Sequence, residues 1–228
     1  MSLRIAEIFT SIQGEGIWVG VPSTFVRVSG CNLRCVWCDT PYASWKPEGP
    51  VMTLEEILDV VRAAKVRHVV LTGGEPMLFD SIEPLAEALR DEGFTITIET
   101  AGTIFRKLPC DLMSISPKLA NSVPPSESGW SERHEASRLQ PEALRQLIAA
   151  YPFQLKFVLE SPDDFAELDE LLAEIAPVDP GRILLMAEGV DHETQVQRLR
   201  SFVPLAIQRN WRLTPRMHVD LFGNTRGT

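Results

Sequence analysis

The chain has 228 residues, of which 44% are hydrophobic and 23% are charged. This composition is typical of one globular domain and excludes a collagen, a disordered tail and a disulfide-dense secreted scaffold. The 22 basic and 31 acidic side chains give a net charge of −9, which disfavours nucleic-acid binding. The N-terminus lacks the apolar run of a signal peptide, and no stretch is long and apolar enough for a membrane helix, so we expect a cytoplasmic protein without membrane contact.

Apolar periodicity predicts an alternation of strands and helices. Strands are expected over residues 4–9, 23–30, 67–74, 94–102, 111–118, 153–160, 182–189 and 211–219. Helices are expected over residues 53–64, 81–93, 141–151, 162–176 and 191–210. Thr53 and Glu56 have the spacing of a capping box, and Gly93 is placed to end the second helix. The polar stretch 120–137 is interrupted by Pro, Gly and Ser, which indicates a loop or lid.

Strands separated by helices predict an α/β fold with a mostly parallel sheet and crossover helices. The repeats are too few for a complete eightfold barrel, so an open, partial barrel or a doubly wound sheet fits better. We expect a single domain over residues 1–228. Ligands of such folds lie at the carboxyl ends of the strands, and the glycine-rich and polar segments of this chain fall there.

Three of the four cysteines, Cys31, Cys35 and Cys38, follow the second predicted strand with the spacing C-x3-C-x2-C. Such clustering indicates metal or redox chemistry in a reducing compartment. A structural zinc site needs four ligands, and the nearest histidine is the distant His68. Three thiolates in one short loop instead suit three irons of a four-iron four-sulfur (4Fe-4S) cluster, with the fourth iron open to a ligand. Cys110 is interpreted as a buried free thiol.

The cysteine loop, with Trp37 directly before its last cysteine, resembles the signature of the radical S-adenosylmethionine (SAM) superfamily. The segments GGEP (73–76), ETAG (99–102) and SPK (116–118) follow predicted strands in the order of that superfamily. The resemblance implies a partial barrel of the radical SAM type, a 4Fe-4S cluster on the three cysteines and SAM on the open iron.

Longer stretches resemble one family within the superfamily. They are EIFTSIQGEG (7–16), TFVRVSGCNLRCVWCDT (24–40), LTGGEP (71–76), ETAGT (99–103), SPKLANS (116–122) and QLKFVLES (154–161). That family converts 6-carboxy-5,6,7,8-tetrahydropterin to 7-carboxy-7-deazaguanine by a radical ring contraction with loss of ammonia, in queuosine and 7-deazapurine biosynthesis. The resemblance implies a lyase that also uses magnesium, acts as a homodimer and takes electrons from a donor such as flavodoxin or ferredoxin.

The resemblance also assigns the SAM site. Glycines at Gly73 and Gly74 permit close approach to the methionine, and Glu75 would accept from its ammonium. Glu99 suits the ribose hydroxyls, and the Lys118 ammonium suits the carboxylate. The full set is Trp37, Cys38, Asp39, Gly73, Gly74, Glu75, Glu99, Ser116, Pro117 and Lys118, with residues 186–189 as a further candidate for the adenine side.

The implied substrate residues are Ile12, Gln13, Gly14, Arg27, Thr72, His218 and Thr228. Arg27 would hold the substrate carboxylate with its guanidinium fork, and Glu15 is a further candidate for the 2-amino group. Thr228 would act through its C-terminal carboxylate. Thr40 is implied to contact magnesium, which prefers oxygen ligands and keeps several waters.

Two other functions are open: a radical SAM activase that generates a glycyl radical on a partner protein, and a non-catalytic iron–sulfur protein. The activase needs a groove for a protein loop, whereas the QGEG, Arg27 and CDT constellation favours a small carboxylated ligand. GGEP and SPK have no use in an electron carrier. Two expectations remain for side chains outside the motifs. His134 and His192 should be solvated, and the 120–137 loop should be a lid over the site or a dimer contact.

Overall fold

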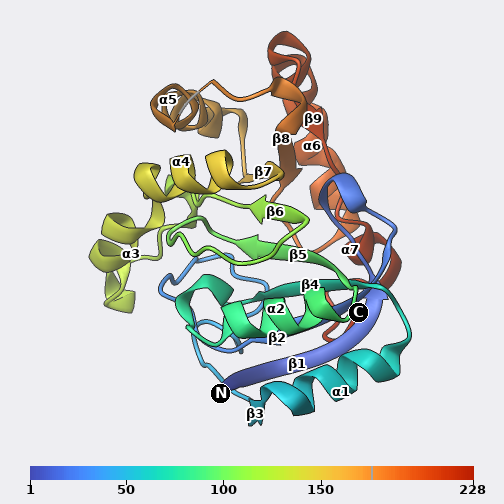
Figure 1. Cartoon of the computed structure of the whole chain (residues 1–228). Helices are drawn as coiled ribbons and strands as arrows, with labels where there is room; N and C mark the ends of the chain where they lie inside the picture. The colour runs from blue at the N-terminus through green and yellow to red at the C-terminus, as the bar shows by residue number, and fades with distance from the viewer. Residues whose placement is uncertain (176) are drawn as a thin grey trace.

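The computed structural model describes residues 1–175 and 177–228. Its strands form one sheet in the order β3-β1-β2-β4-β5-β6-β7-β8-β9 (Figure 1). They are β1 Ser2–Ile12, β2 Pro22–Val28, β3 Val51–Thr53, β4 His68–Gly73, β5 Thr95–Thr100, β6 Leu112–Ile115, β7 Phe153–Leu159, β8 Ile183–Ala187 and β9 Arg212–Leu213. Neighbours from β2 through β4 to β9 are parallel, whereas β1 pairs antiparallel with β2 and β3. The two end strands do not pair within the described residues, which confirms the predicted open, mostly parallel sheet.

Most of the helices cover one face of this sheet (Figure 1). The α-helices are α1 Leu54–Ala64, α2 Ile82–Asp91, α3 Ser131–Arg138, α4 Pro141–Ala150, α5 Phe165–Ile175, α6 His192–Arg209 and α7 Met217–Phe222. Short 3-10 turns are η1 Gly16–Trp18, η2 Pro76–Leu78, η3 Ala120–Ser122, η4 Ser126–Ser128, η5 Pro162–Asp164 and η6 Pro180–Arg182. None of the described helices has the length and apolarity needed to cross a bilayer.

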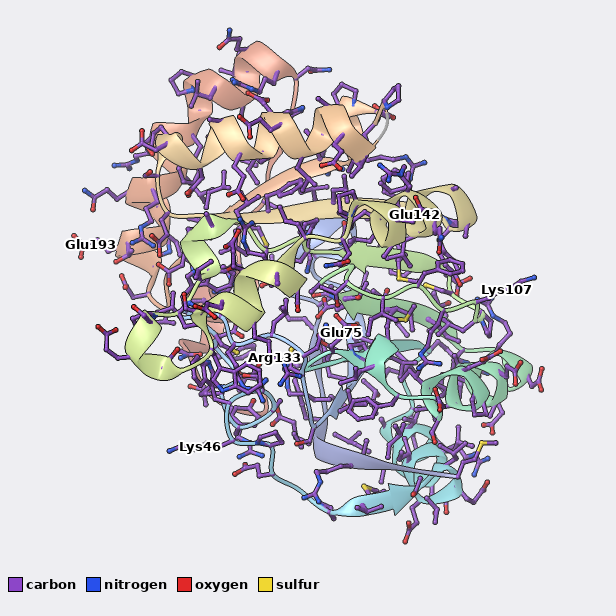
Figure 2. The ribbon with its side chains drawn as sticks, turned by 90° about the vertical axis from the view of Figure 1, so that its left-hand side faces the viewer. Lys46, Glu75, Lys107, Arg133, Glu142 and Glu193 are labelled. Atoms are coloured by element: carbon purple, nitrogen blue, oxygen red, sulfur yellow. The ribbon has the colours of Figure 1, made fainter. Side chains whose placement is uncertain are left out.

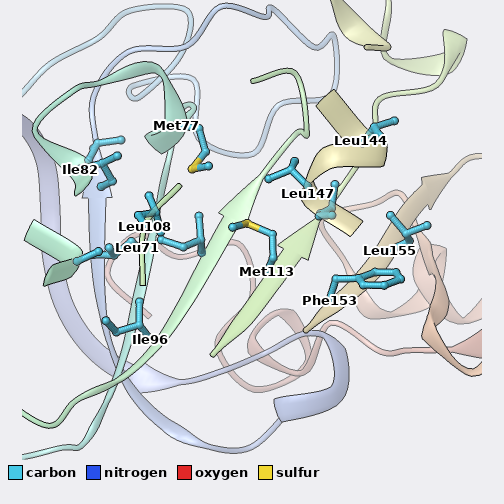
Figure 3. Close-up of a cluster of buried hydrophobic side chains, with 14 of the residues drawn as sticks. Leu71, Met77, Ile82, Ile96, Leu108, Met113, Leu144, Leu147, Phe153 and Leu155 are labelled. Carbon is cyan, nitrogen blue, oxygen red and sulfur yellow. The ribbon is translucent and has the colours of Figure 1, made fainter. Parts of the chain in front are cut away.

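Charged side chains mark the outside of the fold. Figure 2 shows Lys107, Glu142 and Glu193 at the periphery of the molecule, whereas Glu75 lies inside it. Apolar side chains fill the space between the sheet and its helices (Figure 3). Burying each aliphatic side chain there stabilises the fold by about 1.5–3 kcal/mol.

Alternate residues of each strand face opposite sides of the sheet. Leu71 of β4 and Ile98 of β5 are fully buried in the core on the helix side. Their neighbours Thr72 and Glu99 line a cavity on the other side. The curled sheet therefore has an apolar outer face and a polar interior.

The predicted strand over residues 211–219 is wrong for most of its length. Only Arg212–Leu213 pair with β8, and Met217–Phe222 is the helix α7. The Thr214 amide still donates to the Leu185 carbonyl at 3.0 Å, but Pro215 follows, and because proline has no N–H to donate, the pairing does not continue through it. The sequence pattern also missed the three-residue strand β3.

The predicted loop over residues 120–137 holds only in part, because Ser131–Arg138 is the helix α3. The segment contains helix-forming charged residues after Gly129, and Glu135 pairs with Arg138 at 2.7 Å one turn later. The prediction that His134 is solvated is wrong, since its side chain is fully buried. His192 is exposed, as predicted, and pairs with Asp220 at 2.7 Å.

The capping box at the start of α1 is confirmed. The Thr53 hydroxyl accepts from the Glu56 amide at 3.3 Å, and the Glu56 carboxylate accepts from the Thr53 amide at 2.7 Å. Thr53→Ala should therefore lower the free energy of unfolding by about 1 kcal/mol in a urea titration. Ser81→Ala is the matched control, because Ser81 occupies the N-cap of α2 without a side-chain cap bond. Equal losses in the two variants would contradict the assignment.

Candidate active site

A cavity lies at the carboxyl ends of the parallel strands, where this fold class places its ligands. Strands β2, β4, β5, β6 and β7 and the cysteine loop all contribute to its walls. The sequence-predicted residues that line it are Ile12, Gln13, Gly14, Arg27, Cys31, Cys35, Trp37, Cys38, Asp39, Thr40, Thr72, Gly73, Gly74, Glu99, Ser116, Lys118, His218 and Thr228. Residues from both ends of the chain thus meet at one site. Glu75 and Pro117 are absent from this lining within the described residues.

The cysteine loop follows β2 and presents Cys31, Cys35 and Cys38 to the cavity. The Cys38 thiol lies 3.1 Å from the Ser44 hydroxyl. Burial raises the pKa of the Cys31 and Cys35 thiols to about 12. A thiolate is therefore favoured here only beside a cationic partner such as iron.

The donor set fits an iron–sulfur cluster better than a single ion. No three His, Cys, Asp or Glu side chains of the described residues are grouped closely enough to hold one metal ion. Thiolates that ligate three separate irons of a cluster stand farther apart than the ligands of one ion. Three free thiols on one loop, facing one cavity, match that requirement.

Gly73 and Gly74 allow two strand-end loops to touch. The Gly74 amide donates to the Val28 carbonyl at 3.1 Å, directly beneath the start of the cysteine loop. A Cβ on Gly74 would lie 2.1 Å from the Gly30 carbonyl oxygen, and Gly73 has a φ of +138°. Only glycine permits this approach of backbone to backbone.

Glu75 is buried where the loop after β4 meets the end of β5. Its carboxylate accepts from the Met77 amide, the Ala101 amide and the Thr100 hydroxyl at 3.0, 2.8 and 2.8 Å. The side chain is fully buried and lies outside the cavity lining. These bonds tie the loop after β4 to the end of β5, and the role of this carboxylate on the SAM ammonium stays a prediction. Pro117 is buried in the same way.

A buried charged network crosses the floor of the cavity. The Lys156 ammonium donates to Glu15 at 2.8 Å and lies 3.5 Å from Glu99. Arg216 donates to the other Glu15 oxygen at 2.9 Å and also pairs with Asp39 of the cysteine loop. Five segments that are distant in sequence are thereby held together.

Electrostatics keep this network ionised. Burial alone would raise the pKa of Glu15, but the charges of Lys156 and Arg216 outweigh it and hold that pKa well below its usual range. Burial lowers and the two carboxylates raise the pKa of Lys156, with a net increase. Burial lowers the pKa of His218. The cavity floor therefore carries fixed charges beside a histidine that favours its neutral form.

Arg27 is oriented with its terminal nitrogens available. Its Nε donates to Glu7 at 2.7 Å, and the Tyr42 hydroxyl holds the same Glu7 oxygen at 2.7 Å. No residue that the structure describes accepts a hydrogen bond from either Nη atom of Arg27. Phe9, stacked on Phe25 with a centroid distance of 4.9 Å, lies beside the guanidinium. This arrangement suits a carboxylated, planar ligand.

Lys118 also lines the cavity, and its ammonium donates to the carbonyl and hydroxyl oxygens of Ser116 at 2.8 and 2.7 Å. It also lies 5.7 Å from the centre of the Trp37 ring. The cavity thus has two cationic regions, one at Lys118 and one at Arg27.

Sequence reasoning missed several lining residues, above all Lys156 and Arg216. A lysine in the middle of the buried strand β7 is unusual and could have been flagged. Arg216 follows a proline in an irregular segment and carries no sequence signal. The lining residues Met186 and Glu188 fall within the 186–189 turn that the sequence offered as a weaker candidate.

Comparison with known proteins defines the class of this site. Residues 25–122 match the Radical SAM superfamily, and this stretch contains the cysteine loop, GGEP and SPK. The crystal structure of QueE from Escherichia coli superposes with a TM-score of 0.76 at 29% identity and covers 96% of this chain and 95% of that one. The fold and the cysteine loop are those of a radical SAM enzyme.

Relatives that match this chain over its whole given length identify the family within the superfamily. The 7-carboxy-7-deazaguanine synthase of Rhodopirellula baltica is 45% identical over all of this chain and 89% of the relative. The synthase of Halobacterium salinarum is 43% identical over all of this chain and 93% of the relative. The chain belongs to the 7-carboxy-7-deazaguanine synthase family.

The buried network yields a prediction for Glu15→Gln. The substitution leaves Lys156 and Arg216 without a buried counter-charge, so the free energy of unfolding at pH 7 should fall by about 3 kcal/mol. Because the pKa of Glu15 is depressed in the folded protein, its contribution is complete above the unfolded value near 4.5 and is lost as the pH falls further. The difference between wild type and variant in urea unfolding should therefore shrink below about pH 4.5.

Glu55→Gln is the control, since Glu55 forms an exposed pair with Arg62 and its side chain is 69% exposed. Exposed pairs contribute little, so this variant should match the wild type. A Glu15→Gln protein whose stability deficit is small, or unchanged down to pH 3, would contradict the account.

Proposed function

We propose that this protein converts 6-carboxy-5,6,7,8-tetrahydropterin to 7-carboxy-7-deazaguanine, with loss of ammonia, as a radical SAM lyase of queuosine and 7-deazapurine biosynthesis. The observation that carries the proposal is the convergence, in one cavity, of the cysteine loop and the oriented guanidinium of Arg27. End-to-end similarity to proteins named for this reaction supports it. All 228 residues would act as one radical SAM domain.

Cys31, Cys35 and Cys38 would hold a 4Fe-4S cluster through three of its irons. When bound and reduced, the cluster with SAM supplies a 5′-deoxyadenosyl radical for hydrogen abstraction. The protein contributes placement and the exclusion of water. Lys118 would pair with the SAM carboxylate, and the unshielded backbone of Gly73 and Gly74 would lie against its methionine part.

The remaining walls would bind the pterin. Arg27 would hold its carboxylate through two nitrogens, with the guanidinium kept in orientation by Glu7. Gln13 and the backbone at Gly14 would pair with the amide-like edge of the ring. Further contacts would come from Ile12, Thr72, His218 and Thr228, all of which line the cavity.

The charged floor would discriminate between ligand groups. Glu99 accepts from Gln13 at 3.2 Å and from Thr72 at 2.9 Å, so it fixes two of the side chains assigned to the ligands. Lys156 remains protonated and offers a fixed positive charge rather than a general base. The neutral form of His218 would be free to accept or donate a proton as ammonia leaves.

Magnesium, partners and location complete the proposal. The Thr40 hydroxyl lines the cavity and would give magnesium one protein oxygen, with the substrate carboxylate and waters completing its preferred octahedron. The protein would act in the cytoplasm as a homodimer. It would receive its electron from a small carrier such as flavodoxin or ferredoxin.

One anaerobic assay tests the proposed reaction. Reconstituted, reduced protein with SAM, magnesium and 6-carboxy-5,6,7,8-tetrahydropterin should release 7-carboxy-7-deazaguanine, detected by mass. Cys35→Ala should abolish the product because one iron loses its ligand, whereas Cys110→Ala should retain it, since Cys110 lies outside the cavity lining. Release of 5′-deoxyadenosine without the deazaguanine would retain the radical chemistry but refute the substrate, and an activase would then be the better assignment.

A further inference from the structure

The cysteine loop receives much of its support from a segment that no sequence motif explains. The Val36 amide donates to the Ser122 carbonyl at 2.9 Å, and the Trp37 indole donates to the Asn121 carbonyl at 2.9 Å. The Arg34 amide donates to Nδ1 of the buried His134 at 3.0 Å. The two amides that flank Cys35 in sequence are therefore both held by residues 119–138.

The hydrogen bonds fix the tautomer of His134. The Ser122 hydroxyl donates its single proton to the Leu119 carbonyl at 2.6 Å. At its 3.0 Å contact with Nε2 of His134 it must therefore act as the acceptor. Nε2 carries the proton, and Nδ1 is left as the lone-pair acceptor that the Arg34 amide requires. Burial lowers the pKa of His134 to about 4, which agrees with this neutral ring.

The segment is itself fastened to the body of the fold. The Asn121 side chain donates to the Val158 carbonyl at the end of β7 at 3.1 Å. Arg138 donates to Glu167 of α5 at 2.5 Å and to the Lys118 carbonyl at 3.1 Å. On its outer side, the Trp130 ring lies 4.2 Å from the Arg34 guanidinium. The segment thus transmits the rigidity of the sheet and α5 to the cysteine loop.

We propose that the 119–138 segment positions the cysteine loop for cluster binding, with His134 as the positioning residue that orients the backbone on the amino side of Cys35. This inference rests on the proposed function only in that the three cysteines bind a cluster. It adds a third role to the two that the sequence left open for the loop, of which the dimer contact stays a prediction. None of residues 120–137 lines the cavity in the described part of the chain, which argues against a lid, and their bonds to the cysteine loop lie within one chain.

The same contacts explain why the position needs histidine. Between the Arg34 amide and the Ser122 hydroxyl the side chain must accept on one atom and donate from another while fully buried. Leucine fills a similar volume but leaves the Arg34 amide without its partner. Asparagine places an acceptor oxygen near the position of Nδ1. Outer partners of metal ligands typically change metal affinity by about 10–100-fold when removed.

His68 provides a matched control. It too is buried, and both ring nitrogens are hydrogen-bonded, Nδ1 with Ser23 at 2.7 Å and Nε2 with Thr97 at 2.8 Å. It begins β4, at the end of the sheet opposite the cysteine loop. His68→Leu should reduce the stability of the fold as His134→Leu does, without affecting the loop.

The test measures loss of iron to a chelator from reconstituted full-length protein, together with the electron paramagnetic resonance spectrum of the reduced cluster. His134→Leu should lose iron at least about tenfold faster than wild type and show an altered spectrum. His134→Asn should restore most of the retention, and His68→Leu should match wild type. Equal loss from both leucine variants would reduce His134 to a structural role, and wild-type retention in His134→Leu would overturn the proposal.

A second measurement does not require the protein to contain a cluster. Hydrogen exchange of the cluster-free protein should show protected amides at Arg34 and Val36, with protection at Arg34 reduced in Ser122→Ala, which removes the acceptor that sets the His134 tautomer. If His134→Leu does not fold, Ser122→Ala replaces it as the test variant. An Arg34 amide that exchanges without protection in the wild-type protein would refute the proposal. Wild-type protein that retains its cluster but makes no deazaguanine would refute the proposed function alone.

Discussion

The structure depends on holding three thiols at fixed positions with a loop that forms neither helix nor strand. The constraint explains features that lie far apart in the chain. Gly74 has no Cβ because the loop after β4 must touch the backbone at Gly30. Asp39, at the exit of the loop, is fastened to Arg216 near the C-terminus. Side-chain and carbonyl acceptors of residues 119–138 take up amides that a short irregular loop leaves without partners.

The polar inner face of the open sheet follows from a second constraint, the binding of charged ligands. A buried ion pair seldom adds stability over well-packed apolar side chains, so Glu15, Lys156 and Arg216 are better explained by the ligands than by the fold. Their charges fix Gln13, Glu99 and the cysteine loop relative to one another before any ligand enters. Such preorganisation lowers the loss of side-chain conformational entropy on ligand binding. The same strands present apolar side chains to the helices, so stability and recognition occupy opposite faces of one sheet.

The sequence predicted most of the regular secondary structure, but few of the contacts between residues that lie far apart in the chain. Apolar patterns located seven of the nine strands in the described part of the chain, and the spacing of Cys31, Cys35 and Cys38 with the strand-end motifs located the site. The local pattern does not reveal the three donors to Glu75, which are two backbone amides and the Thr100 hydroxyl. Arg216 and His134 were missed or misjudged because each is defined by partners far away in the chain, whereas the position of Lys156 in a buried strand carried a signal. The predicted strand over residues 211–219 ends before Pro215, because proline has no backbone N–H to donate to the sheet despite the apolar pattern around it.

The central claim is that three cysteines hold a cluster whose fourth iron is open to a ligand in the cavity. It is tested most directly by the electron paramagnetic resonance spectrum of the reduced wild-type protein before and after addition of SAM. Direct binding of SAM to the open iron should change the principal g values, and a Lys118→Ala variant should need a higher SAM concentration for the same change. A spectrum that SAM leaves unaltered at saturating concentration, or a cluster with no open iron, would contradict the account.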